Sequence, residues 1–203
     1  NYLYIADYDY GTVAVGQLVD NNGDVTIQGN KADGYLMDLK SDVIVGAGLD
    51  ENSLDGVYGH AQALLLEGDY LYVTAYFDSY EGSSYSQEWP GNEQPGYLLK
   101  YKIDQATGKL DLYSVAQIGI NPCYSTIAKY NNSFYVAALG GSNAQGDYDY
   151  DGINEETSIN MVTMNQYGDF EDGRAITVPQ NAIDAYFNEN GKYIEEQRIR
   201  ERC

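Results

Sequence analysis

The chain has 203 residues and a formal net charge of −20 at pH 7, with 22 Gly and 22 Tyr beside only 4 Pro and 3 Met. This length fits one or two domains, and such a composition favours short strands joined by turns over packed helices. An acidic surface repels phosphates, so nucleic acid and anionic membranes are disfavoured as partners. Solubility, a high-salt habitat or a location at the cell exterior explains the acidity better than a specific cationic partner does.

No apolar run approaches the roughly 20 residues of a membrane span, and no charged-then-apolar signal opens the chain. Two cysteines, Cys123 and Cys203, are too few for a disulfide framework. Because the chain opens inside a strand pattern, we expect a leader or earlier repeats to precede it.

One strand motif recurs along the chain. Residues 2–5 spell Tyr-Leu-Tyr-Ile, residues 70–73 spell Tyr-Leu-Tyr-Val, and shorter echoes follow at residues 134–136 and 193–194. The copies lie roughly 60 residues apart, slightly more than the roughly 40 to 50 residues of the commonest propeller repeats. The pattern therefore predicts a repeat protein with the excess length in loops.

Taken in chain order, alternating apolar segments bounded by Gly, Asn and Asp turns predict three strands in the first unit and four in each of the next two. The first unit has strands at residues 2–8, 12–15 and 25–27. The second has strands at residues 61–66, 70–77, 97–103 and 110–118. The third has strands at residues 125–129, 134–139, 159–164 and 175–178. A meander of four strands makes one propeller blade.

A fourth unit begins at residues 182–187 and 193–194 and gives way to a basic tail, residues 192–203, whose composition favours helix or disorder. The predicted fold is an all-β β-propeller of four-stranded antiparallel blades over residues 1–191, with about three blades present. Three blades cannot close a ring of the usual four to eight. Either the chain is a piece of a longer propeller, or self-association completes the ring, with residues 182–187 of one chain pairing with residues 2–8 of another.

Four motifs, in order over roughly residues 1 to 140, carry a family resemblance. They are the strand pair at residues 4–8 and 11–15, Gly59-His60-Ala61 ahead of residues 69–73, the Asp-Gln-Ala-Thr-Gly-Lys-Leu turn at residues 104–110, and Asn121-Pro122 ahead of residues 134–137. With them the chain resembles the lactonase-type seven-bladed β-propellers, the group of 6-phosphogluconolactonase and carboxymuconate cyclase. The resemblance implies a lactone hydrolase for a sugar-derived or other small lactone, with His60 as its catalytic residue.

The sequence departs from that family where its cations would lie. Residues 122–124 spell Pro-Cys-Tyr where the family has His and Arg after a proline, and residues 139–141 spell Leu-Gly-Gly where it has an acid. Stabilising an oxyanion or a phosphate needs fixed cations, and Arg174 is the only arginine before residue 192. His60 could instead form a structural hydrogen bond across blades. We therefore expect a ligand-binding or scaffold module, with the hydrolase as the alternative.

An acidic loop predicts a metal site. Residues 147–155 have the form D-x-D-x-D-G-x-x-E, which alternates carboxylates around a tight glycine turn, and they resemble the Ca²⁺ hairpin loops of integrin-type propellers. Such a loop wraps oxygen ligands around one Ca²⁺. The expected ligands are Asp147, Asp149, Asp151, the carbonyl of Ile153, and Glu155. An EF-hand is disfavoured because Ser158 holds its twelfth position, and a solvated acidic loop is the alternative.

A long insertion at residues 78–96 separates two strands of the second unit and contains the only tryptophan. Loops of this length are usually functional or disordered. Its aromatic side chains, Tyr80, Tyr85 and Trp89, lie among polar residues, a mixture that could stack on the rings of a glycan or anchor a protein partner. The alternative is that Trp89 packs against the edge of the blade.

Overall fold

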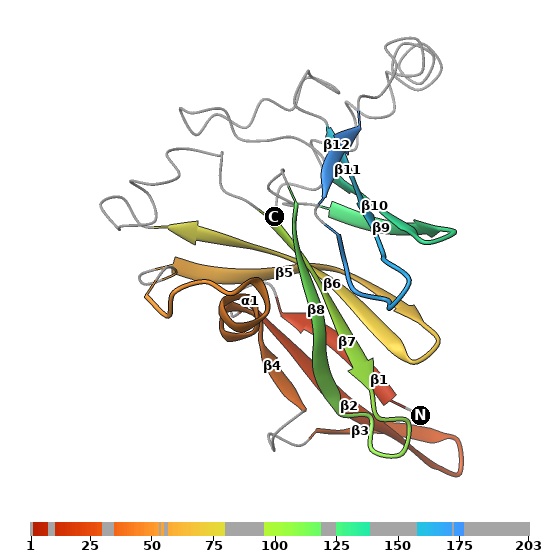
Figure 1. The fold of residues 1–203 in the computed structure, drawn as a ribbon. Coiled ribbons are helices and arrows are strands. Elements are labelled where there is room, and N and C mark those ends of the chain that lie inside the picture. Colours follow the sequence, from red (N-terminus) through yellow and green to blue (C-terminus); the bar gives the residue numbers. More distant parts are fainter. Residues whose placement is uncertain are drawn as a thin grey trace, which may run out of the picture.

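The computed structural model describes residues 2–7, 11–29, 35–52, 54, 57–79, 96–118, 125–138, 158–171 and 173–176, which form three antiparallel sheets and one short helix (Figure 1). The first sheet contains β1 (Tyr2–Asp7), β2 (Thr12–Asn21), β3 (Asp24–Gly29) and β4 (Leu36–Asp38), and helix α1 (Leu39–Ala47) follows it. The second sheet contains β5 (Val57–Glu67), β6 (Tyr70–Ser79), β7 (Gly96–Ile103) and β8 (Leu110–Ile118). The third sheet contains β9 (Ser125–Tyr130), β10 (Ser133–Ala138), β11 (Ser158–Thr163) and β12 (Arg174–Ile176).

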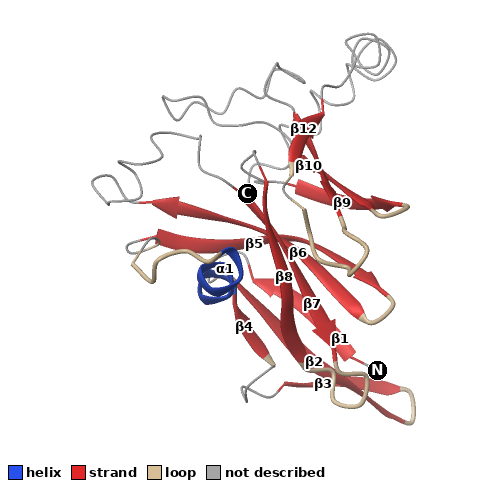
Figure 2. Cartoon of the chain, viewed as in Figure 1, coloured by secondary structure: helices blue, strands red, loops and turns tan. Residues whose placement is uncertain are grey.

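The order of strands within the sheets confirms the predicted meanders and the all-β class. The second and third sheets are ordered β5-β6-β7-β8 and β9-β10-β11-β12. In the first sheet β3 and β4 pair with successive parts of the same edge of β2. Asn22 and Gly23 both have positive φ, 59° and 93°, which is the two-residue turn that matches the twist of a hairpin. Figure 2 shows how strands dominate the described part of the chain.

The three sheets stack with the second in the middle, and an apolar core fills each of the two interfaces (Figure 1). Side chains alternate between the faces of a strand, so β6 contributes to both cores. Leu71, Val73 and Phe77 pack toward the first sheet and α1. Tyr72 packs toward the third sheet, with its ring centroid 4.3 Å from that of Phe134. Burial on both faces places β6, together with β7, at the centre of the stack.

Helix α1 and strand β4 were not predicted from the sequence, which suggested no element between residues 27 and 61. Asp38 caps the helix by accepting hydrogen bonds from the Lys40 amide at 3.1 Å and the Ser41 hydroxyl at 3.0 Å. Gly48 ends it with a left-handed φ of 67°. A short helix of this kind depends on tertiary packing, which the buried Leu39 supplies at the first interface.

Asp42 connects helix α1 to the second sheet. The Tyr101 hydroxyl, on β7, donates a 2.6 Å hydrogen bond to Asp42 Oδ2. Burial raises the pKa of the Asp42 carboxyl above its usual range, the hydrogen bond from Tyr101 opposes this, and the charge of Asp38 adds to it. The folded protein therefore binds a proton at Asp42 more tightly than the unfolded chain does.

Replacing Asp42 by asparagine is expected to remove a pH dependence from the stability. A carboxyl whose pKa is raised in the folded state stabilises the fold at low pH, and this contribution is lost as pH rises through the folded pKa. Asparagine keeps an acceptor for Tyr101 without a charge. In urea unfolding, Asp42→Asn should gain stability over the wild type at about pH 7, and the difference should fade toward about pH 3, below the ordinary aspartate pKa. The exposed Asp111 of β8 supplies the control, since Asp111→Asn should show no such trend.

The predicted fourth unit, residues 182–187 and 193–194, and the basic tail at residues 192–203 lie outside the described residues. Among the residues that the structure describes, no helix is long and apolar enough to cross a membrane.

Candidate functional site

Of the side chains proposed from the sequence as functional, the structure describes His60. Tyr80, Tyr85 and Trp89 of the insertion lie outside the described residues, as does the whole acidic loop with Asp147, Asp149, Asp151, Ile153 and Glu155. Within the described ranges, no group of three or more His, Cys, Asp and Glu side chains is close enough to hold a metal ion. The predicted calcium and glycan sites therefore stay predictions, and the geometry of the described residues bears on His60.

His60 lies on β5 directly opposite Tyr76 of β6. The two rings are stacked, with centroids 4.8 Å apart and planes inclined by 27°. His60 is 9% exposed and Tyr76 is 2% exposed, so the imidazole offers little surface to a substrate. One face of the ring is covered by a side chain of its own sheet, which favours a structural role.

The backbone beside His60 is fixed against the first sheet. Gly59 comes so close to Gly11 that a Cβ on Gly11 would lie 2.3 Å from the carbonyl carbon and oxygen of Gly59. Gly11 has a φ of +57°, and its own carbonyl accepts a 3.1 Å hydrogen bond from the Leu39 amide at the start of α1. The His60 segment is thus packed where the first sheet, the helix and the second sheet meet.

A polar link beside the bulge in β5 joins the second sheet to the third. The pairing of β5 with β6 shifts register between Ala61 and Leu64, which frees an amide at Ala63. The Ala63 amide donates a 3.0 Å hydrogen bond to the Thr74 hydroxyl, and that hydroxyl lies 2.8 Å from the hydroxyl of Ser125 on β9. Thr74 is fully buried, so the link satisfies polar groups that would otherwise be costly to bury.

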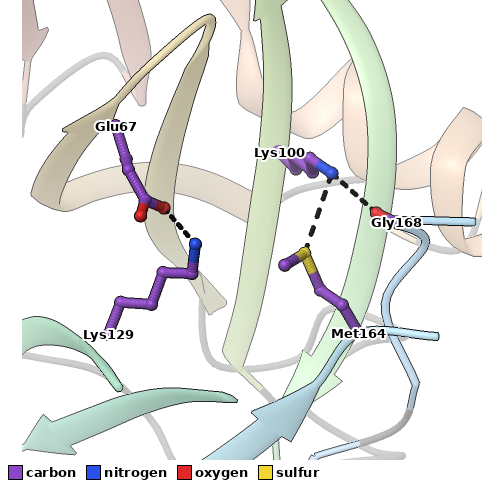
Figure 3. A network of polar contacts seen from close by, with 5 residues as sticks. All are labelled: Glu67, Lys100, Lys129, Met164 and Gly168. Atoms are coloured by element: carbon purple, nitrogen blue, oxygen red, sulfur yellow. Dashed lines mark hydrogen bonds and ion pairs between the residues drawn. The ribbon is translucent and has the colours of Figure 1, made fainter. Parts of the chain in front are cut away.

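Lys100 is a buried cation that the sequence did not reveal (Figure 3). Its Nζ donates a 2.6 Å hydrogen bond to the Gly168 carbonyl and contacts Met164 Sδ at 3.7 Å, both beyond the end of β11. The same nitrogen lies 4.1 Å from the ring centroid of Tyr70 and 4.4 Å from that of Tyr113, a cation–π arrangement. Lysines in strands usually point to solvent. The feature that points to its burial is the strand register: Lys100 lies opposite Tyr72, on the face of the second sheet that packs against the third sheet.

The surroundings of Lys100 shift the pKa of its side-chain ammonium. Burial lowers the pKa of the ammonium, and the carboxylate of Asp169 partly opposes this by attracting the proton. With 3% of its surface exposed, the side chain cannot reach a substrate in this arrangement. Lys100 therefore serves to attach the second sheet to the third.

A second basic residue spans the same interface near the surface. Lys129 of β9 forms an ion pair with Glu67 at the end of β5, with 2.5 Å between Nζ and Oε2 (Figure 3). The Glu67 side chain is 46% exposed, and exposed pairs of this kind contribute about 0 to 1 kcal/mol. The pair therefore adds little to the stability of this interface.

The tyrosines that reveal the repeat in the sequence hold successive sheets together. The hydroxyl of Tyr2 on β1 donates to the Ala106 carbonyl at 2.8 Å, and that of Tyr4 donates to the Gly108 carbonyl at 3.4 Å. Both acceptors lie in the turn between β7 and β8. Gly108, with φ +75°, comes so close that a Cβ would lie 2.3 Å from Tyr2 Cδ1. The turn that carries the family resemblance thus closes a hairpin and also binds the first sheet.

A related contact, with different donors, joins the second sheet to the third. Tyr113 donates a 3.0 Å hydrogen bond to the Tyr167 carbonyl in the turn that follows β11. The Lys100 ammonium donates to the Gly168 carbonyl of the same turn. The ring of Phe170, just beyond the turn, lies 6.2 Å from that of Tyr72. The β7–β8 turn thus packs on Tyr2 and Tyr4 of β1, whereas the turn after β11 packs on Lys100 of β7 and Tyr113 of β8.

The two turns share a local design. Asp104 accepts a hydrogen bond from the Ala106 amide at 2.8 Å, and Asn165 accepts one from the Tyr167 amide at 2.8 Å. Hydrogen bonds from Thr107 and the backbone lower the pKa of the Asp104 carboxyl. Each turn ends at a glycine with positive φ, Gly108 in the first and Gly168 in the second. Short side chains that hydrogen-bond two residues ahead are typical of such turns.

The described buried polar side chains are His60, Thr74 and Lys100, and the last two bridge the second and third sheets. These two side chains therefore contribute to the packing between those sheets. No protein-family model matches the chain, and no curated protein matches it. The resemblance to lactonase-type propellers therefore rests on the sequence motifs, and it stays a prediction.

Proposed function

We propose that the chain is a lactonase-like β-propeller that works as a Ca²⁺-stabilised ligand-binding or scaffold module. The observation that carries the proposal is a contact found at both interfaces, in which the Asx-and-glycine turn between the last two strands of one sheet accepts hydrogen bonds from side chains of the sheet before it. Propeller blades are four-stranded sheets arranged in succession around a central channel. Long loops between their strands are then the natural place for binding.

The environment of His60 supports binding over catalysis. A general acid or base must come within hydrogen-bond reach of the reacting group, whereas His60 is 9% exposed and stacked on Tyr76. Lys100, a cation that could stabilise an oxyanion, is 3% exposed and donates to the Gly168 carbonyl. A lactone hydrolase remains the second candidate because His60 occupies the position that matches the family motif.

The deciding experiment measures binding and hydrolysis on the same preparation. Glycan-array binding should be detected and should be lost in Trp89→Ala, while Tyr113→Phe, an exposed tyrosine outside the insertion, should leave it unchanged. Neutral and phosphorylated lactones should be hydrolysed no faster than in buffer. Hydrolysis that falls at least about a hundredfold in His60→Gln, within the usual contribution of a general base, with the melting temperature kept, would instead establish the hydrolase.

Calcium is expected to raise the melting temperature. A ligand that binds the folded state at about 100 times its Kd adds about 2.7 kcal/mol, or about 5 to 10 °C for a chain of this size. The double variant Asp149→Asn, Asp151→Asn should lose the shift, since it removes two predicted ligand charges. The charge-matched control is Asp24→Asn, Asp111→Asn, which should keep the shift. A calcium response that survives in the loop variant would place the ion elsewhere, and equal shifts with Mg²⁺ would contradict a site built for Ca²⁺.

A further inference from the structure

Each sheet of the stack has two distinct faces. We call the face toward the following sheet the leading face and the face toward the preceding sheet the trailing face. In the second sheet, Tyr70 and Tyr72 belong to the leading face, and Leu71 and Val73 belong to the trailing face. The trailing face is mainly apolar at both interfaces: Leu71 and Val73 are at most 1% exposed, and Phe134 in the third sheet is fully buried. Ser125 and Lys129 of β9 add polar groups to this face of the third sheet.

The trailing face of the first sheet is apolar in the same way but is exposed. Residues opposite one another in an antiparallel pair share a face, and the registers of the first sheet place five apolar side chains together. They are Leu3, Ile5, Leu18, Ile27 and Leu36. Ile5 is 44% exposed, Leu36 is 45% exposed and Ile27 is 54% exposed. Apolar patches of this kind mark interaction surfaces.

The leading face of the third sheet is the complementary end of the stack. Tyr135 of β10 lies opposite Met161 of β11, which lies opposite Arg174 of β12, so all three side chains share the face that points away from the second sheet. Tyr130, at the end of β9, is on this face and is 70% exposed. Tyr135 occupies the position that Tyr72 occupies in the second sheet, where a following sheet covers it.

The charges at the two ends also match. The trailing face of the first sheet is bounded by Asp7 at one end of its strands and Asp20 at the other, since both share the register of Ile5 and Leu18. The leading face of the third sheet carries the exposed guanidinium of Arg174, the only arginine before residue 192. In a chain with a net charge of −20, an exposed arginine on this face favours an acidic partner.

We propose that a second copy of this chain covers both ends, the third sheet of each copy packing on the first sheet of the other. The contact continues the packing seen twice within the chain, because it again sets a tyrosine-bearing leading face on an apolar trailing face. Two such contacts place the three described sheets of each copy in one ring of six, within the range of four to eight blades that rings adopt. A head-to-tail contact of this sort forms a closed ring when the rotation between the copies closes, and an open filament when it does not.

Analytical ultracentrifugation of the 203-residue chain tests the proposal. The expected mass is twice the 22.5 kDa of one chain. Ile27→Glu and Ile5→Glu place a charge on side chains that are exposed within one chain, so each should keep its circular dichroism spectrum and raise the dimer dissociation constant by about a hundredfold, because the charge would be buried without a partner. Val45→Glu is the matched control. Val45 is 75% exposed on α1, away from both faces, and its variant should remain a dimer.

A second set of variants separates this arrangement from other dimers. Tyr130→Glu and Arg174→Glu change the leading face alone, and both should also dissociate the dimer. An equimolar mixture of Ile27→Glu with Tyr130→Glu should recover a dimer, since one intact leading face then meets one intact trailing face. A monomeric wild-type chain would overturn the proposal. A dimer that Tyr130→Glu leaves intact would overturn it as well, because it would show that the leading face does not take part in the contact.

Discussion

Replacing Gly11 by alanine is expected to lower the melting temperature by about 10 °C, at about 2 to 4 °C per kcal/mol. A Cβ there would lie 2.3 Å from the backbone carbonyl of Gly59, and no side-chain rotation can relieve a clash with backbone. Overpacking costs about 1 to 3 kcal/mol or more, and the left-handed φ of +57° adds about 1 to 2 kcal/mol for a residue with a side chain. The total exceeds that of most point substitutions.

Gly48→Ala is the matched control for this effect. Gly48 has a similar φ of +67°, yet a Cβ at this position would meet no atom within 4 Å. Its substitution should therefore cost only the backbone term, about 1 to 2 kcal/mol. Thermal unfolding followed by circular dichroism measures both. Equal losses of melting temperature in the two variants would show that the first and second sheets can move apart to accommodate the Cβ without a loss of stability.

Lys100→Ala is the second substitution with a large expected effect, about 3 kcal/mol of unfolding free energy. It would leave a cavity between the rings of Tyr70 and Tyr113 and remove the donor to the Gly168 carbonyl, two losses that each cost about 1 to 3 kcal/mol at buried sites. Lys100→Met fills most of that volume and contacts both rings, so it should cost about 1 kcal/mol.

The control for Lys100 is Lys102, two residues along β7 and exposed. Lys102→Ala should change the stability by no more than about 0.5 kcal/mol. Urea unfolding gives all three values, and hydrogen exchange at β9 and β10 should rise in Lys100→Ala before exchange at β1 and β2 does. If alanine and methionine at position 100 behaved alike, the ring contacts would have no energetic role.

The strands could be predicted because their information is local. Alternating apolar residues and turn residues such as Asn22-Gly23 and Asn131 fix each hairpin from within a few positions, and β8 begins and ends at the predicted residues. Helix α1 was missed because its formation depends on packing at residues such as Gly46, which lies so close to β8 that a Cβ would be 2.2 Å from Val115 Cγ2. Strand β4 has only three residues and forms through its pairing with β2.

The residues of the candidate site also differ in how far the sequence could predict them. His60 stands out in the sequence as the only histidine, but its burial against Tyr76 depends on the register of β5 and β6. The part played by Lys100 depends on a turn 68 residues further along the chain, so no local pattern could indicate it. Conversely, the aromatic insertion and the acidic loop remain predictions from sequence, because they lie outside the described residues.

The sequence by itself determined the repeat, the strands and the all-β class, since alternation and turn chemistry act over a few residues. Only the tertiary structure decided which faces meet. Tyr2 and Tyr4 connect the first sheet to the second because their hydroxyls donate hydrogen bonds to carbonyl groups of the β7–β8 turn. Gly11 and Gly59 are in contact because the same two sheets approach closely there. Burial depends on groups distant in the chain, so the stacking of the sheets, and with it the exposed apolar face of the first one, could be seen only in three dimensions.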